Sequence, residues 1–156
     1  MANLNILTKV SSGAHYYDVI APAGLVAGNA VEILTINTDG TYDVQAPTAI
    51  TTKGVAISVP VTLPYEADVE QNDYAIATGE ITRVLVPEVG QKIDFPVANF
   101  TATVAVAATK FIILDAGALK MECVNALGGT ESIAFMVDKV YTKAGVSMAQ
   151  IRCIQE

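Results

Sequence analysis

The clearest folding signal in this sequence lies at residues 133–154, IAFMVDKVYTKAGVSMAQIRCI. Two apolar runs, 133–141 and 146–154, flank the short segment 142–145, which contains a glycine. Runs rich in Val and Ile favour strands, and a Gly-containing connection of this length is typical of a hairpin turn. The second run has mostly apolar side chains on both of its faces, as expected for a strand that is covered on both sides. The stretch therefore predicts a β-hairpin whose second strand is covered on both faces.

The rest of the chain has the same texture of short apolar runs separated by turn residues. Val, Ile and Thr recur throughout, and their branched side chains favour a pleated surface. Residues 74–86 predict either a long strand bent at Gly79 or a short hairpin, and residues 130–137 suit a short helix or a strand equally well. Further strands are expected at 16–20, 30–36, 41–44, 54–59, 93–95, 101–106, 110–114 and 119–124.

Turn chemistry divides these runs at regular intervals. Asp39-Gly40 is the strongest single hairpin signal, because glycine tolerates the positive φ of a tight primed turn. Strands that recur every 8–12 residues indicate an all-β sandwich or barrel. We therefore expect an all-β fold of short antiparallel strands, with a C-terminal β-hairpin lobe as a possible addition.

The domain organisation that follows is simple. Residues 1–15 are expected to form an N-terminal arm or edge strand, and residues 16–156 a single β-rich domain. Residues 101–156 could form a sub-lobe of that domain. The chain has 156 residues, which suits one domain.

The composition is unusually apolar for a chain without a membrane-spanning segment. Apolar residues make up 52% of the chain and charged residues only 16%, against about 25% charged in average soluble proteins. The apolar runs are far shorter than the roughly 20 residues that a membrane helix needs, and no secretion leader is evident. A surface with so few charges is most easily explained if other proteins cover much of it. This suggests a component of an assembly.

The formal net charge is −7, and the nine Lys and Arg residues are scattered along the chain. Binding to nucleic acid depends on clustered cations that release counterions. We therefore expect neither a nucleic-acid partner nor a membrane partner.

The two cysteines, Cys123 and Cys153, lie in apolar runs that predict strands. Free cysteine is among the most buried residue types, so two buried thiols are expected. A disulfide between neighbouring strands is the alternative. One histidine and two cysteines offer little from which to build a zinc site.

His15 is the single histidine, and it could act as a general base if Asp18 oriented it. Strand alternation places these two residues on opposite faces, and the chain lacks a recognisable nucleophile turn. His15 is therefore expected at a strand edge or an interface. We do not expect an enzyme.

Carboxylates concentrate at two-residue spacing in residues 65–73. If this segment is extended, Glu66, Asp68 and Glu70 share one face. Three interpretations remain open: a solvated loop, a Ca²⁺ site built from these oxygens, or a patch that docks on basic residues of a partner. The segment lacks the glycine and terminal glutamate of a calcium loop, so no metal or cofactor is expected.

Four glycine-containing stretches follow one another through the first two thirds of the chain, at residues 23–33, 53–57, 77–81 and 89–93. They share turns of the Gly-x-x-Val and Gly-Val-Ala kind. Their order resembles the small capsid decoration proteins of tailed bacteriophages, which are also called cement or auxiliary head proteins. The resemblance covers roughly residues 20 to 95 and extends to chain size and β-rich texture. It transfers no site residue.

The resemblance implies a structural protein that binds the outside of an assembled phage capsid and stabilises the shell without doing chemistry. Its partners would be the major capsid protein and further copies of itself, as a homotrimer. It would be made in the host cytoplasm and reside on the capsid surface of the virion.

The apolar residues Leu4, Ile6 and Val10 alternate near the N-terminus, so this segment could add a strand to a neighbouring sheet edge. Together with Glu66, Asp68 and Glu70 they are the expected contacts to the capsid or to a neighbouring copy. Two other functions fit the same features. One is a different virion subunit, of the tail tube or the head–tail connector, and the other is a non-viral β-barrel that binds a ligand in its mouth.

Overall fold

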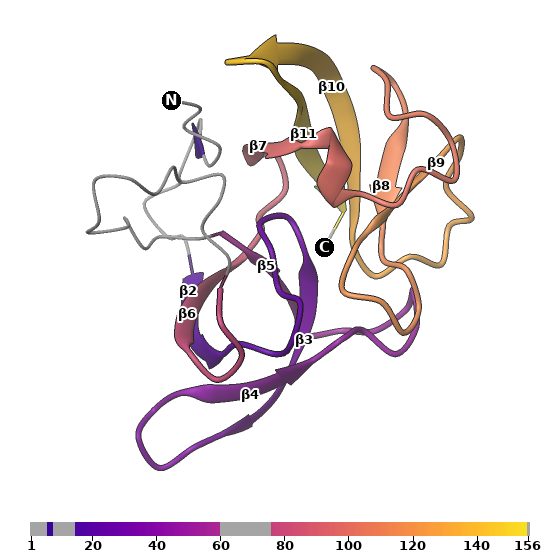
Figure 1. The fold of residues 1–156 in the computed structure, drawn as a ribbon. Helices are drawn as coiled ribbons and strands as arrows, with labels where there is room; N and C mark the ends of the chain where they lie inside the picture. Colours follow the sequence, from indigo (N-terminus) through magenta and orange to yellow (C-terminus); the bar gives the residue numbers. More distant parts are fainter. Residues whose placement is uncertain (1–5, 8–14, 60–75, 156) are drawn as a thin grey trace.

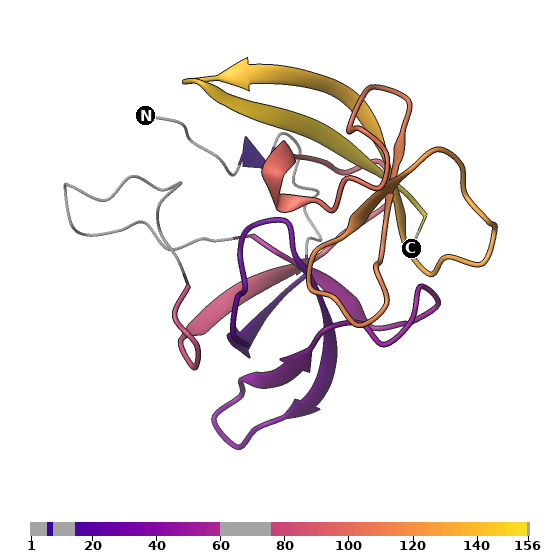
Figure 2. The same cartoon turned by 45° about the vertical axis from the view of Figure 1, so that its right-hand side comes forward.

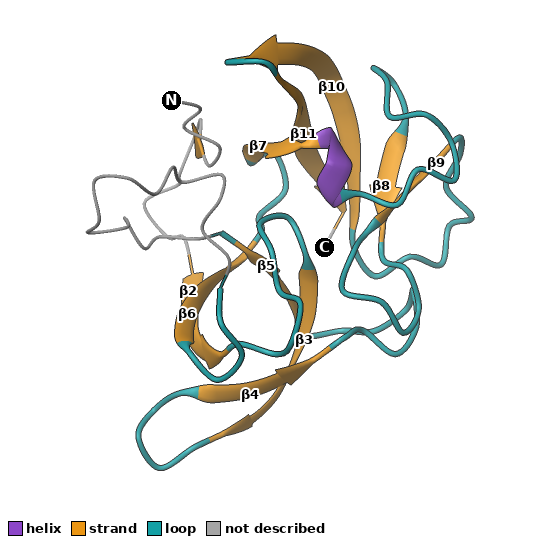
Figure 3. Cartoon of the chain, in the orientation of Figure 1, coloured by secondary structure: helices purple, strands orange, loops and turns teal. Residues whose placement is uncertain are grey.

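The structure is a computed structural model that describes residues 6–7, 15–59 and 76–155. Within these ranges it consists of strands and a single short 3-10 helix, with no α-helix (Figures 1 and 3). The all-β class expected from the sequence is confirmed. The elements are β1 (Ile6–Leu7), β2 (His15–Ile20), β3 (Ala30–Ile36), β4 (Tyr42–Gln45), β5 (Val55–Ser58), β6 (Ile81–Val86), β7 (Lys92–Pro96), η1 (Val97–Asn99), β8 (Phe111–Ile113), β9 (Glu122–Val124), β10 (Ala134–Lys143) and β11 (Val146–Gln155).

Five strands close into a small barrel in the order β2-β4-β3-β5-β6. Every neighbouring pair is antiparallel except β2 and β4, which run parallel and pair at Val19 and Tyr42. Closure leaves the barrel without a free sheet edge, which removes the usual template for edge-to-edge aggregation. Its interior is filled by alternate side chains of its strands, including Val19, Val31, Ala56 and Val84.

The other six strands form an antiparallel sheet in the order β1-β7-β11-β10-β8-β9. Its centre is the hairpin of β10 and β11, which confirms the hairpin expected at residues 133–154. Ala144 and Gly145 both have positive φ, as a two-residue type I′ turn requires. A bulge between Val137 and Lys139 shifts the register, and bulges of this kind increase the local strand twist.

The barrel and the six-stranded sheet share one apolar core. All four residues of β5 are buried. Ala56 points into the barrel cluster, whereas Ile57 belongs to the cluster that also contains Phe95 and Phe135 of the sheet. β6 is divided in the same way, with Val84 inside the barrel and Leu85 in the shared core. The wall of the barrel is therefore covered on both faces at these strands.

The structure corrects two details of the sequence prediction. The connection between β3 and β4 is not a two-residue primed turn: Gly40 N donates to Asn37 O, Asn37 N donates to Thr41 O, and Gly40 alone has positive φ. This is the three-residue loop in which a type I turn is followed by a left-handed residue. In addition, the strand expected at 101–106 is reduced to an isolated bridge between Thr101 and Glu122. Thr101 N donates to Met121 O and Cys123 N donates to Thr101 O, but the chain then bends at residues 103 and 104, which ends the pairing.

The two undecided segments are also settled where the structure describes them. Residues 130–137 contain no helix, and β10 begins at Ala134. In the 74–86 segment, a turn closed by the bond from Glu80 N to Ala77 O precedes β6, and the strand itself begins at Ile81.

Gly28 packs against Phe95 of the six-stranded sheet, and substituting it tests this contact. Its φ is +84°, and a Cβ atom there would lie 3.0 Å from Cγ of Phe95. Gly28→Ala should lower the free energy of unfolding by roughly 2–4 kcal/mol, because left-handed strain and overpacking add. Gly24→Ala is the matched control, since Gly24 also has positive φ (+79°) but a Cβ atom there would have no neighbouring atom within 4 Å. It should lose only about 1–2 kcal/mol. Equal losses in urea unfolding would contradict a tight contact with Phe95.

Candidate docking surface and cleft

The β3–β4 hairpin projects from the barrel on the side away from the β10–β11 hairpin (Figures 1 and 2). Near its end, Leu34 and Ile36 expose 45% and 62% of their surface. Ile81, at the start of β6, is 61% exposed. These are three of the five large apolar residues that are strongly exposed among the described residues.

The register of the strands brings Ile81 to the same end of the barrel as the hairpin. Ile36 pairs with Tyr42, Tyr42 with Val19, and Val19 with Thr82, so four neighbouring strands meet in one row. Neighbouring strands lie about 4.8 Å apart, so this row spans roughly 14 Å along the sheet. We call the exposed side chains of Leu34, Ile36 and Ile81, with the carboxylates of Asp39 and Asp43, the barrel-end patch.

Hydrogen bonds hold the hairpin loop in one shape. Oδ1 of Asp39 accepts bonds from Thr41 N at 3.0 Å and Thr41 Oγ1 at 2.7 Å. These bonds lower the pKa of Asp39 from its ordinary value. Nδ2 of Asn37 donates to Oδ1 of Asp43 at 3.1 Å. Both carboxylates of the patch are therefore fixed by neighbouring polar groups of the loop.

Charge is divided unequally between the two parts of the chain. The described residues of the barrel part, 15–59 and 76–86, include two basic and five acidic residues, whereas residues 87–155 include six basic and six acidic residues. The net negative charge of the described residues therefore lies on the barrel part. One of its two bases, Arg83, is ion-paired with Asp18 at 3.0 Å.

His15 and Asp18 are not brought together. They lie three positions apart on β2, and Nε of Arg83 donates to Oδ1 of Asp18 across the β2–β6 pair. His15 instead lines a cleft at the mouth of the barrel. The structure thus gives His15 and Asp18 different surroundings, as strand alternation predicts.

The cleft has a volume of about 1000 Å³ and lies between the barrel and loops of the second part of the chain. Its wall is mainly apolar, with Val89 exposed at the rim. Polar groups on the rim include His15, Lys53 and Glu88. Pockets of this size with few polar groups are typical places for small ligands. The lining also includes Tyr17, Ile33, Val55, Val86 and Ile133.

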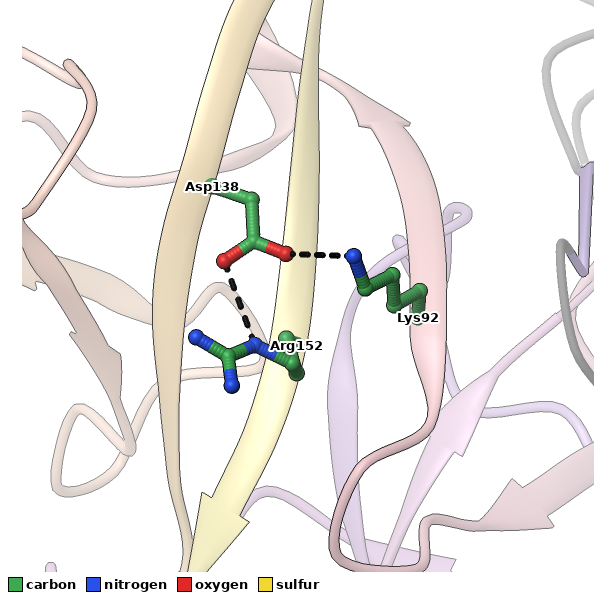
Figure 4. Close-up of polar contacts among 3 residues, drawn as sticks. All are labelled: Lys92, Asp138 and Arg152. Atoms are coloured by element: carbon green, nitrogen blue, oxygen red, sulfur yellow. Dashed lines mark hydrogen bonds and ion pairs between the residues drawn. The ribbon is translucent and has the colours of Figure 1, made fainter.

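Three charged side chains, Lys92, Asp138 and Arg152, are linked on the six-stranded sheet (Figure 4). Asp138 Oδ2 lies 3.1 Å from Nζ of Lys92, and its Oδ1 accepts a bond of 3.2 Å from Nε of Arg152. Burial by itself would raise the pKa of Asp138, but the hydrogen bonds and charges of Lys92 and Arg152 outweigh it, so the pKa is lowered. Asp138 lies in the bulge of β10, between Val137 and Lys139, and links β10 to β7 and β11. The group therefore ties three strands together.

Cys123 and Cys153 are buried thiols in β9 and β11 of the shared core and are not joined by a disulfide. The expected pair of buried thiols is confirmed, and the alternative of a disulfide is not. Burial raises the pKa of Cys123, so its reactive thiolate form is disfavoured.

Most of the contacts expected from the sequence lie outside the described residues: Leu4, Val10, Glu66, Asp68 and Glu70. Ile6 is in β1, where it pairs with Asp94 of β7 in the same chain. Among the residues that the structure describes, no three His, Cys, Asp or Glu side chains gather in a way that could hold a metal ion. No helix in the described ranges is long and apolar enough to span a membrane.

Sequence reasoning does not single out the barrel-end patch. Residues 30–36 are expected as a strand, but their alternation does not show which apolar residues extend beyond the barrel. One signal is present: residues 30–46 contain three acidic residues and no basic residue. A strand pair with a single sign of charge and apolar residues near its turn is a candidate surface for a partner.

Comparison of the chain with models of known protein families and with curated proteins finds no match.

Asp138 gives a pH-dependent prediction. Its folded pKa lies below the unfolded value near 3.8, so its contribution to stability is fully present above that pH and is lost as the pH falls through the folded pKa. Asp138→Asn should cost about 1 kcal/mol at neutral pH, because Lys92 and Arg152 are partly exposed and water screens the pairs.

Urea unfolding at a series of pH values measures this difference. The mutant and the wild-type protein should converge in acid, below the folded pKa of Asp138. Asp18→Asn is the control, because its pair with Arg83 is about half exposed on both sides and should change stability less. A loss for Asp138→Asn that does not depend on pH would show that packing, and not charge, is responsible.

Proposed function

We propose that this chain is a structural virion protein that binds the outside of an assembled phage capsid and stabilises the shell without chemistry. The observation that carries the proposal is the uneven surface of the barrel part, which combines the net negative charge of the described residues with exposed large apolar side chains. Such a surface suits a protein partner, because apolar contact supplies affinity while complementary charge sets register and encounter rate. The glycine-punctuated stretches that resemble decoration proteins indicate which class of partner to test.

The proposed activity needs only binding. A protein that binds the intact shell, and not its dissociated subunits, stabilises the shell by the free energy of binding. Because many copies bind at symmetric positions, their binding free energies add, so each single contact can be weak. The major capsid protein would be the partner, and the chain would form a homotrimer at its position on the shell. On this proposal the chain needs neither cofactor nor metal, and its place is the capsid surface of the virion.

The proposal predicts saturable binding to heads. The probe is the expanded empty head assembled from the major capsid protein encoded in the same genome, purified without this chain. Co-sedimentation should reach a fixed number of copies per head and should raise the temperature at which the head dissociates. The affinity should fall when salt rises from about 0.05 to about 0.5 M, because the contact is partly electrostatic.

Heads of an unrelated phage serve as the control and should bind no copies. Failure of the wild-type chain to bind its own heads at any salt concentration would overturn the proposal. Polymerisation of the purified chain into rings or tubes would instead favour a subunit of the tail tube or the connector.

A second candidate function, a ligand-binding barrel, is supported by the cleft at the barrel mouth. An apolar fluorescent probe such as anilinonaphthalene sulfonate should then bind with a stoichiometry of one, because the cleft is mainly apolar and Lys53 lies on its rim. Val89→Glu should weaken this binding without unfolding the chain, because it removes an apolar side chain and adds a charge that repels the sulfonate, and Val89 is 61% exposed. Val140→Glu is the matched control on β10. Equal probe binding by both variants and the wild type would remove this candidate.

A further inference from the structure

We propose that the barrel-end patch is the docking surface, and that it fits a protein surface with an apolar hollow ringed by Lys and Arg. This inference rests on the proposed function and adds to it the face that docks and the chemistry of the partner. The patch consists of Leu34, Ile36 and Ile81 with the carboxylates of Asp39 and Asp43.

Three of the five strongly exposed large apolar side chains among the described residues lie at this end. Leu34 and Ile36 are two positions apart on β3, and the row of paired residues from Ile36 to Thr82 connects them to the start of β6. Ile20, directly opposite Ile81 on β2, is partly buried and extends the apolar surface. Scattered apolar residues on a surface need no explanation, whereas gathered ones mark contacts with other molecules.

The charges around the patch indicate the chemistry of the partner surface. Residues 30–46 carry Glu32, Asp39 and Asp43 and no basic residue. The nearest base on β6, Arg83, is held by Asp18. Two copies of such a patch would repel each other face to face, so a symmetric dimer through it is disfavoured. A cationic rim on a different protein complements it.

Hydrogen bonds within the β3–β4 loop order it before any partner binds. Asp39 accepts two bonds from Thr41, and Asn37 donates to both Thr41 and Asp43. A loop that is already ordered loses little conformational entropy on binding, so more of the contact energy remains as affinity.

The arrangement also sets the orientation of the bound chain. The β3–β4 hairpin and the β10–β11 hairpin project in opposite directions (Figures 1 and 2). A chain that docks by the barrel-end patch would turn the β10–β11 hairpin, with Lys139 and Val140 exposed, away from the partner.

Apolar substitutions test the surface directly. The double variant Ile36→Ser with Ile81→Ser should weaken binding to the empty heads described above by at least about tenfold, because two apolar contacts are lost. The matched control is Val89→Ser with Val140→Ser, which also removes two exposed apolar side chains but at other places. It should bind within about twofold of the wild type. Thermal unfolding of the free variants checks that both fold.

Charge substitutions test the partner's chemistry. The double variant Asp39→Asn with Asp43→Asn retains side-chain oxygens that can accept the loop hydrogen bonds, but it removes two negative charges. It should bind more weakly at low salt and show a shallower dependence on salt than the wild type. Asp115→Asn with Glu122→Gln, on the other part of the chain, is the control and should keep the wild-type dependence.

The outcomes separate this inference from the proposed function. If the wild-type chain does not bind heads, the proposed function fails. If it binds and the Ile36/Ile81 variant binds equally well, or no more weakly than its control, the patch is not the docking surface. If that variant changes the mass of the free protein in light scattering but not its binding to heads, the patch contacts another copy, and the inference is wrong.

Discussion

The structure depends on strands that are buried on both faces. In β5, Ala56 packs inside the barrel, and the neighbouring Ile57 packs against Phe95 and Phe135 of the six-stranded sheet. Successive side chains of a strand point to opposite faces, so a slip of one residue would exchange the two environments and leave both cores badly filled. The barrel wall thus fixes the register of the barrel and the position of the sheet together. Gly28 completes this contact, because its missing side chain leaves room for the ring of Phe95.

The packing of the barrel wall against the six-stranded sheet limits which surfaces other molecules can reach. β3 buries Ala30 and Val31 at its start, β5 buries all four of its residues, and β6 buries Val84 and Leu85, so these positions offer nothing to a partner. The ring of five strands has no free edge, and β9 is bridged to Thr101 at its own edge. The end of the barrel is left open, where β3 and β4 extend past their neighbours and expose Leu34 and Ile36. Where the core covers the barrel wall, a partner can reach only loops and strand ends, and the proposed docking surface is one of these.

Local patterns predicted some elements correctly and misplaced others for identifiable reasons. The hairpin at 133–154 was predictable because its two runs are long and its turn residues, Ala144 and Gly145, adopt the required positive φ. Residues 101–106 have the composition of a strand, but the chain bends at residues 103 and 104 after a single bridge to Glu122, and composition does not reveal that bend. Asp39-Gly40 marked a hairpin correctly, yet the loop has three residues because Asp39 bonds to Thr41 and keeps an ordinary φ.

The sequence by itself determined the all-β class, the main hairpins, the buried cysteines and the excess of negative charge, because these follow from residue type and from periodicity along the chain. Only the tertiary structure decided that five strands close into a barrel, that β2 and β4 pair in parallel, and that Ile36 and Ile81 reach the same end. These features depend on contacts between residues far apart in the chain. Strand alternation predicts which side chains share a face of the strand, but it does not predict what packs against that face. Burial on both faces of β5 and exposure at the end of β3 are therefore properties of the assembled fold.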